Sequence, residues 1–232
     1  MKPGKILFLF LILIIAGCAD DGDPSELSIL TIDHDFNEGQ HGWVAGFAEF
    51  PANHEDSSAF ELKFEYTQVE SKLSKRSVML SGKNLNQDLF MYIKRKVENL
   101  KPDTDYTITF NVELTSDLLS VQTDKGGSVF LKAGAIHAEP KSVIEGGNYI
   151  MNIDKGNQES SGEDMVTLGN LLEDGTGTAY ALITRSNTMA NSRYVGRTNS
   201  KGELWLIIGT DSNVSGTTKV FYTRIKVLLS VS

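Results

Sequence analysis

Side-chain oxygens are concentrated in one short stretch of the sequence, NIDKGNQESSGE, at residues 152–163. The first, third, seventh and twelfth positions of this stretch carry oxygen ligands of the kind that Ca²⁺ prefers: Asn152, Asp154, Gln158 and Glu163. An EF-hand loop requires glycine at the sixth position, where this sequence has Asn157. We therefore expect no metal site and interpret the stretch as an Asx turn in which Gly156 supplies a positive φ. The alternative is an irregular calcium site with Asn152, Asp154 and Gln158 as candidate ligands.

A second group of residues combines aromatic and charged side chains. Such side chains can bind a ligand by ring packing and by hydrogen bonds. Such side chains cluster at residues 43–50 and alternate along residues 88–94. The candidate ligand-binding residues are Trp43, Phe47, Glu49, Asp88, Tyr92 and Lys94. Because tryptophan is highly buried on average, the alternative interpretation places Trp43 and Phe47 in the core.

Catalytic and zinc-binding motifs are missing from the sequence. The four histidines form neither an HxH nor an HExxH pair, so we expect no zinc site. The sequence contains no G-x-S-x-G motif. The paired carboxylates of a glycosidase need a defined separation in space, which sequence spacing does not give. We therefore expect a non-catalytic protein without a cofactor, and a hydrolase is the weaker alternative.

The N-terminus has the three parts of a secretory signal peptide. Lys2 and Lys5 form its basic region, and the apolar run at residues 6–16 is shorter than the roughly 20 residues that span a bilayer as a helix. The segment Ile-Ala-Gly-Cys follows at residues 15–18 and contains the single cysteine of the chain. This segment resembles the lipobox of bacterial lipoproteins, which implies a signal peptide at residues 1–17 and a lipid on Cys18. The alternatives are an ordinary cleavage site beside a chance cysteine and a short membrane anchor.

Two further features of the sequence, the residues that follow the cysteine and the overall charge, indicate where the protein is located and which partners it can bind. Residues 18–26 are acidic and contain glycine and proline, so they predict a flexible tether. The formal net charge of −8 argues against nucleic acid as a partner, because nucleic-acid binding needs clustered lysine and arginine. We expect a protein of the cell envelope that is held on a membrane by its lipid, in the outer membrane and either periplasmic or surface-exposed.

From residue 27 onward the sequence predicts β-strands. Residues 106–114 are the clearest case, because apolar and polar side chains alternate with the period of two that marks a strand with one wet face. The predicted strands are residues 27–32, 43–50, 60–66, 78–81, 89–97, 106–114, 129–136, 149–153, 179–184, 204–208 and 220–229. No stretch has a 3.6-residue apolar period over three turns. The sequence therefore predicts a single antiparallel β-sandwich domain over residues 27–232.

The stretch NLKPDTDYTITFNVE, at residues 99–113, resembles jelly-roll domains of the galactose-binding-like and carbohydrate-binding-module type. The stretches DFNEGQHGW and VFYTRIKVLL are similar to the first and last strands of those domains. The resemblance implies an all-β, antiparallel jelly-roll β-sandwich of about ten to eleven strands with a glycan as ligand. Many such modules end in an acidic residue that helps to hold a structural calcium, whereas this chain has residues 221–224, FYTR, at that place.

The chain most closely resembles a set of bacterial secreted proteins that have no established activity. The shared stretches are GWVAGFAEFP, LSGKNLNQDLFMYIK, MNIDKGNQ and LWLIIGTDS. From the sequence we expect a lipid-anchored cell-envelope protein that acts as a non-catalytic binding module for a glycan. A structural lipoprotein that binds another envelope protein is the alternative. An exposed aromatic pair on a sheet face would favour a glycan, and a flat apolar patch would favour a protein partner.

Overall fold

The computed structural model describes residues 29–69, 74–120, 127–173 and 179–232. These residues form fifteen strands, one α-helix and one 3₁₀ helix. In chain order the elements are β1 (Ile29–Asp35), β2 (Val44–Ala48), β3 (Phe50–Pro51), α1 (His54–Ser58), β4 (Lys63–Gln68), β5 (Arg76–Asn84), β6 (Leu89–Val97), β7 (Asp105–Ser116), η1 (Asp117–Ser120), β8 (Val129–Ile136), β9 (Ser142–Glu145), β10 (Asn148–Met151), β11 (Val166–Asn170), β12 (Ile183–Ser186), β13 (Tyr194–Arg197), β14 (Leu204–Ser212) and β15 (Gly216–Val231). The predicted signal peptide, Cys18 and the tether lie outside the described residues. Neither described helix is long and apolar enough to cross a membrane.

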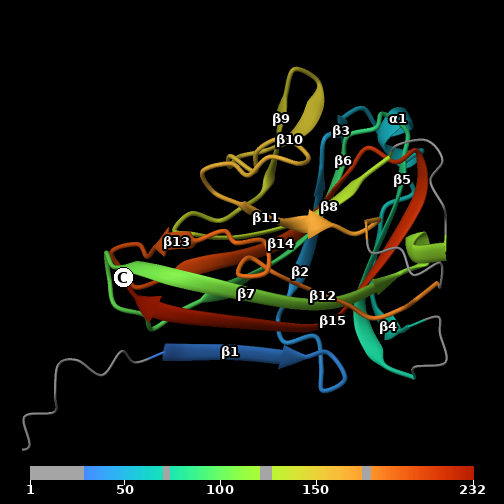
Figure 1. Cartoon of the computed structure of the whole chain (residues 1–232). Coiled ribbons are helices and arrows are strands. Elements are labelled where there is room, and N and C mark those ends of the chain that lie inside the picture. Colours follow the sequence, from blue (N-terminus) through green and yellow to red (C-terminus); the bar gives the residue numbers. More distant parts are fainter. Residues whose placement is uncertain (1–28, 70–73, 121–126, 174–178) are drawn as a thin grey trace, which may run out of the picture.

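Two antiparallel sheets form the main body of the protein (Figure 1). The large sheet has the strand order β12-β7-β15-β5-β4, and β1 and β13 pair with parts of β15 and β7. The second sheet has the order β11-β8-β14-β6-β2. From β5 to β8 each successive strand crosses to the other sheet. The predicted fold class, an antiparallel jelly-roll β-sandwich, is therefore confirmed.

Strand β7 shows how the sequence specifies this sandwich. Its buried residues alternate with partly exposed ones along residues 105–114. The buried set belongs to the core between the two sheets and consists of Tyr106, Ile108, Phe110, Val112 and Leu114. The prediction that Ile108 and Phe110 are core residues is confirmed. Because β15 pairs with β7 along almost its whole length, this one strand pair runs through the centre of the large sheet.

A third layer covers part of the outer face of the five-stranded sheet. It contains the small sheet β3-β10-β9 and the loop that follows β10. Beneath it the rings of Phe90 and Tyr92 stack with their centroids 5.6 Å apart, in a second core with Met151. A Cβ atom at Gly46 would lie 2.2 Å from the Tyr92 ring, and one at Gly209 would lie 2.6 Å from the Phe90 ring. The two glycines therefore let both rings lie directly on the backbone of the sheet.

The structure has more strands than the predicted ten to eleven, although every predicted segment overlaps a strand. Residues 43–50 divide into β2 and β3, because Glu49 interrupts the strand with a φ of 64°. The strands β9, β11 and β13 were not predicted. Each of them spans four or five residues, which is too short for a period of two to stand out. The five-residue helix α1 escapes detection for the same reason.

Trp43, a predicted ligand-binding residue, lies in the core and has no exposed surface. Its indole Nε1 donates a hydrogen bond to Nδ1 of His34 over 3.1 Å. His34 also stacks on His41, with ring centroids 4.8 Å apart, and contacts the guanidinium of Arg95. Burial, the Arg95 cation and His41 together lower the pKa of His34 to about 4. Nε2 of His41 forms a hydrogen bond with the backbone carbonyl of Asp35 over 2.7 Å, so this side chain caps a turn.

Replacing Phe110 with alanine is expected to lower the free energy of unfolding by about 3–5 kcal/mol, because the side chain is fully buried. The neighbouring Thr109, on the partly exposed side of β7, is the matched control. Thr109→Ala is expected to lower it by less than about 1.5 kcal/mol. Denaturant unfolding of the purified variants measures both values, and equal losses would contradict the orientation of β7.

The free energy of unfolding is also expected to fall as the pH drops from 6.5 to about 4. In this range the unfolded chain protonates His34, whose ordinary pKa is 6.5, while the folded protein keeps this side chain neutral. The drop should be smaller in His34→Gln, whose amide oxygen can still accept a hydrogen bond from Trp43. The exposed His137 provides the control variant His137→Gln, whose free energy of unfolding should have the same pH dependence as that of the wild type. An unchanged pH profile in His34→Gln would rule out this role.

Candidate functional site

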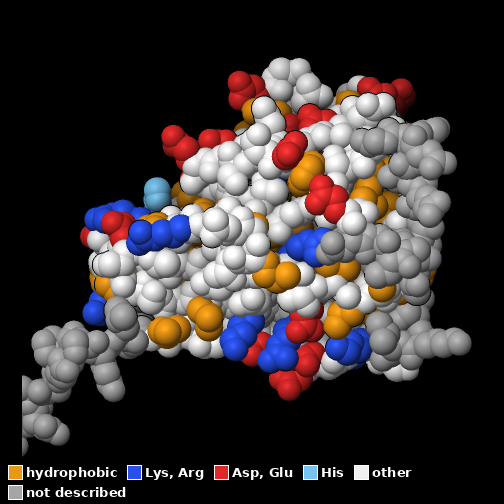
Figure 2. Space-filling view, in the orientation of Figure 1, with side chains coloured by type: hydrophobic (Ala, Val, Ile, Leu, Met, Phe, Trp, Pro, Cys, Tyr) orange, Lys and Arg blue, Asp and Glu red, His pale blue; other side chains and the backbone are white. Residues whose placement is uncertain are grey.

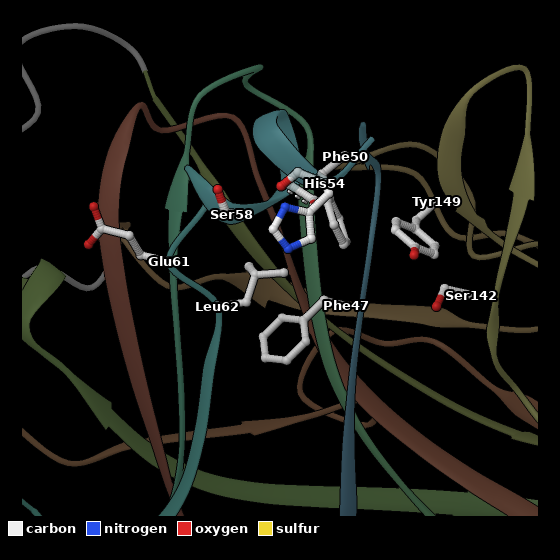
Figure 3. A pocket seen from close by; sticks show the side chains of 9 residues that line it. Phe47, Phe50, His54, Ser58, Glu61, Leu62, Ser142 and Tyr149 are labelled. Carbon is white, nitrogen blue, oxygen red and sulfur yellow. Dashed lines mark hydrogen bonds between the residues drawn. The ribbon is translucent and has the colours of Figure 1, made fainter. Parts of the chain in front are cut away.

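An open groove lies between the β2–β3 segment, α1 and the β9–β10 hairpin (Figure 3). Its volume is about 560 Å³, and its walls combine aromatic, apolar and hydroxyl-bearing side chains. The lining residues are Phe47, Phe50, His54, Ser57, Ser58, Glu61, Leu62, Ser142 and Tyr149. We call this cavity the aromatic groove.

The aromatic rings of the groove are positioned by strand pairing. Phe50 on β3 lies opposite Tyr149 on β10, and the two ring centroids are 4.9 Å apart. Phe50 is buried and packs on Phe60, whose ring centroid is 5.5 Å away. The rings of Phe47 and Tyr149 are only partly buried, and Figure 3 shows Phe47 beside Leu62. The groove therefore presents two ring surfaces whose positions are fixed by buried neighbours.

Polar groups line one rim of the groove. Helix α1 begins at the N-cap Asn53, whose side chain accepts a hydrogen bond from the backbone N–H of Asp56. The helix brings His54, Ser57 and Ser58 to the groove, because residues three and four apart lie on one side of a helix. Glu61 follows on the same rim. An imidazole, two hydroxyls and a carboxylate thus stand beside the aromatic rings, and together they can bind a molecule that has an apolar face and a polar edge.

A second cavity, which we call the polar pocket, has a volume of about 730 Å³. It is lined by the β5–β6 turn, the end of β10, the loop after β10 and Glu49. The lining residues are Glu49, Asn86, Gln87, Asp88, Ile150, Met151, Ile153, Asp154, Lys155, Gly156, Asn157 and Gln158. Glu49 follows β2 directly, so one short segment of chain contributes Phe47 and Phe50 to the aromatic groove and Glu49 to the polar pocket.

Buried charges lie next to the polar pocket. Lys132 and Asp211 have no exposed surface, and Lys155 is 9% exposed. Nζ of Lys155 lies 2.8 Å from Oδ2 of Asp211 and 3.9 Å from Oε1 of Glu49, and Nζ of Lys132 lies 3.7 Å from Oδ2 of Asp211. Burial lowers the pKa of Lys132 to about 8. Burial also raises the pKa of Glu49, and partial burial raises that of Asp88.

Residues 152–163, the stretch considered for calcium, lie in a loop that surrounds the ammonium group of Lys132. The ammonium of Lys132 donates hydrogen bonds to the backbone carbonyls of Lys155, Asn157 and Ser160, over 2.9, 3.2 and 2.8 Å. Among the described residues, no three His, Cys, Asp or Glu side chains are placed to hold a metal ion. The loop carbonyls that could have turned towards a metal are therefore directed at a lysine.

The side chains proposed as calcium ligands hold the backbone of this loop. The carboxylate of Asp154 accepts hydrogen bonds from the backbone N–H groups of Gly156 and Glu163, over 2.9 and 3.0 Å. Gly156 has a φ of 70°, so the predicted Asx turn is confirmed. The side chain of Asn152 joins the loop to the segment before β9, because it bonds with the backbone of Glu139 and Lys141. Gln158 donates to the carbonyl of Gln87 over 3.1 Å.

The six predicted ligand-binding residues do not form one site. Phe47 lines the aromatic groove, and Glu49 and Asp88 line the polar pocket. The structure places Trp43 in the core and Tyr92 under the third layer. Lys94 forms an ion pair with Glu139 over 2.7 Å and lies over the ring of Trp205. Its side chain lines neither cavity.

Several residues of the two cavities were not predicted from the sequence. Tyr149 lies opposite Phe50 only because β10 pairs with β3, and no sequence motif indicates that pairing. His54, Ser57 and Ser58 reach the groove on a helix of one and a half turns, which leaves no periodic signal. The run from Asn53 to Asp56 is a short N-cap signature and is the one local signal that could have located this helix. Nothing in the sequence distinguishes Lys155 from a surface lysine, because its ion pair with Asp211 is formed only in the folded structure.

No protein-family model matches the chain, and no curated protein matches it. Among solved structures, the chain is similar to the CBM22-1 and GH10 modules of an endo-1,4-β-D-xylanase from Clostridium thermocellum, complexed with xylohexaose. The TM-score is 0.41 at 10% identity, over 87% of this chain and 28% of that chain. It is also similar to the CBM22-1 xylan-binding domain of a Paenibacillus barcinonensis protein, with a TM-score of 0.37 at 10% identity, over 88% of this chain and 95% of that chain. For the CBM27-1 module of Caldicellulosiruptor saccharolyticus in complex with mannohexaose, the TM-score is 0.35 at 11% identity, over 85% of this chain and 97% of that chain.

Proposed function

We propose that this chain is a non-catalytic glycan-binding module and that the aromatic groove is its binding site. The observation that carries the proposal is the pair of partly exposed rings, Phe47 and Tyr149, beside the polar rim formed by α1 and Glu61. A sugar ring has faces of C–H groups and an edge of hydroxyls. The two aromatic rings match the faces, and the imidazole, hydroxyl and carboxylate groups of the rim match the edge.

The shape of the groove favours an oligosaccharide over a single sugar. In Figure 3 the labelled side chains are spread from Glu61 and Leu62 at one end to Tyr149 and Ser142 at the other. An open groove covers only part of each bound sugar unit, so affinity must come from several units bound in a row. Because Phe47 and Tyr149 both pack against the buried core, little side-chain entropy is lost when a ligand binds.

The alternative of a protein-binding lipoprotein finds less support on the surface. On the face shown in Figure 2, hydrophobic side chains lie scattered among polar and charged ones. A protein-docking site normally needs a contiguous apolar patch of several hundred Å². Below β7 in the same view, over β1 and β15, charges of both signs are mixed. Arg224 of β15 and Asp33 of β1 form an ion pair over 2.7 Å.

The proposal includes a membrane anchor in the cell envelope. Its support is the lipobox-like segment that ends at Cys18 and the acidic residues 18–26 after it. Two or more acyl chains anchor a protein stably, because each buried methylene contributes about 0.8 kcal/mol. A tethered module of this kind would hold glycans close to the membrane surface.

Glycan-array screening of the purified protein is expected to reveal oligosaccharide ligands that depend on the groove. Phe47→Ala and Tyr149→Ala should each lower the affinity at least about tenfold, equivalent to about 1.4 kcal/mol, because each removes one ring surface. Trp205 is the matched control, a partly exposed aromatic residue that does not line the groove. Loss of binding in Trp205→Ala with full binding in both groove variants would place the site elsewhere.

Cys18→Ser is expected to abolish lipid attachment and to move the protein out of the membrane fraction, because serine has no thiol to be acylated. Ser25→Ala, in the tether, should stay in the membrane fraction. Mass spectrometry of the wild-type N-terminus and membrane fractionation of both variants check this. An unlipidated Cys18 in the mature wild-type protein would refute the anchor.

A further inference from the structure

The polar pocket contains more negative than positive charge. Three carboxylates, those of Glu49, Asp88 and Asp211, lie at or beneath the pocket together with two ammonium groups, those of Lys132 and Lys155. The carboxylate of Asp154 is a separate case, because two backbone N–H groups bond with it. One negative charge therefore has no partner even when both lysines are counted.

Lys155 shares its charge between Asp211 and Glu49, so it neutralises the two carboxylates that line the pocket only in part. Lys155 is held 2.8 Å from Asp211, and its ammonium lies over the ring of Phe90, 5.3 Å from the centroid. Lys132 is surrounded by three backbone carbonyls of the loop. Oε1 of Glu49 is 3.9 Å from Lys155, which is too long for a hydrogen bond. Within the described part of the chain, Asp88 makes no ion pair.

A third carboxylate, that of Asp211, is buried beneath Glu49 and Asp88, and only one of its two oxygens has a partner among the described residues. Asp211 has no exposed surface, and its Oδ1 has no hydrogen-bond partner among the described residues. Its negative charge acts on both pocket carboxylates, since it contributes to the raised pKa values of Glu49 and Asp88. The side chain of Glu49 is 18% exposed, so water solvates it only in part. Excess negative charge in such a place favours a ligand that brings a positive charge.

The size of the pocket favours an organic cation over a bare ion. Its volume of 730 Å³ lies in the range of small-molecule sites, and no three metal-ligating side chains converge among the described residues. An ammonium group donates three hydrogen bonds and can direct them at carboxylate and amide oxygens. The amides of Gln87, Asn157 and Gln158 line the rest of the pocket and can bond with hydroxyls.

We propose that the polar pocket is a binding site for an amino sugar, whose ammonium lies between Glu49 and Asp88 while its hydroxyls face the amides of the loop after β10. The site is separate from the aromatic groove and does not depend on the function proposed for that groove. Its specificity comes from charge, because an N-acetylated or a neutral sugar would leave the excess negative charge of the pocket uncompensated.

Titration calorimetry of the full-length protein with glucosamine tests the proposal, at a pH below the pKa of the sugar amine. Saturable binding is expected, and N-acetylglucosamine and glucose should each bind at least about tenfold more weakly. Glu49→Gln and Asp88→Asn should each weaken glucosamine binding several-fold, because each removes one of the charges that attract the ammonium. Glu163→Gln is the matched control, since Glu163 is an exposed acid of the same loop outside the pocket.

Two further measurements, on Phe47→Ala and with a lysine derivative, complete the test. Phe47→Ala should leave glucosamine binding unchanged, which separates this site from the aromatic groove. Equal binding of glucosamine and N-acetylglucosamine, or no effect of Asp88→Asn, would overturn the proposal. Asp88 is exposed, so this variant remains informative even if Glu49→Gln fails to fold. Binding of Nα-acetyl-lysine methylamide as tight as that of glucosamine would overturn the assignment to a sugar.

Discussion

The ammonium of Lys132 holds the third layer of the molecule against the five-stranded sheet. Three carbonyls of the loop after β10 converge on this ammonium, and Lys155 of the same loop is bound to Asp211. Tyr149 and Ser142 of the aromatic groove belong to the strands β10 and β9 of this layer, and the wall of the polar pocket is the loop itself. Both cavities therefore depend on a cation buried in the sheet beneath them. Removing one member of such a network leaves a charge without a partner, which is strongly destabilising.

Sequence patterns were sufficient to predict most strands of the sandwich, but not the layer that covers its five-stranded sheet. The strands β6 and β8 have the predicted bounds. The half-buried strand β7 alternates as predicted, because one wet face imposes a period of two. The small sheet is built from strands of two to four residues whose pairing depends on contacts between distant parts of the chain. No local pattern encodes that pairing, so Tyr149 and the rim residues of α1 could not be assigned to a common site.

The predicted ligand-binding residues fall into different groups, because their side chains point in different directions in the structure. Of the predicted residues, Phe47, Glu49 and Asp88 line cavities. Trp43 and Tyr92 have the same chemistry but face the two cores, which only the tertiary structure reveals. In the stretch with calcium-like spacing, residues 152–163, acids and amides hold a loop whose carbonyls surround a lysine.

The two glycines under the stacked rings have a consequence for reading other sequences. Gly46 and Gly209 leave no room for a Cβ beneath Tyr92 and Phe90, so even an alanine at either position would push a ring outward. The displaced ring would in turn lift the covering layer from the sheet. A larger residue at either position therefore requires a smaller side chain in place of the ring above it, or a covering layer that lies farther from the sheet. The two glycines and the two rings thus have to change together in any related chain that keeps this layer.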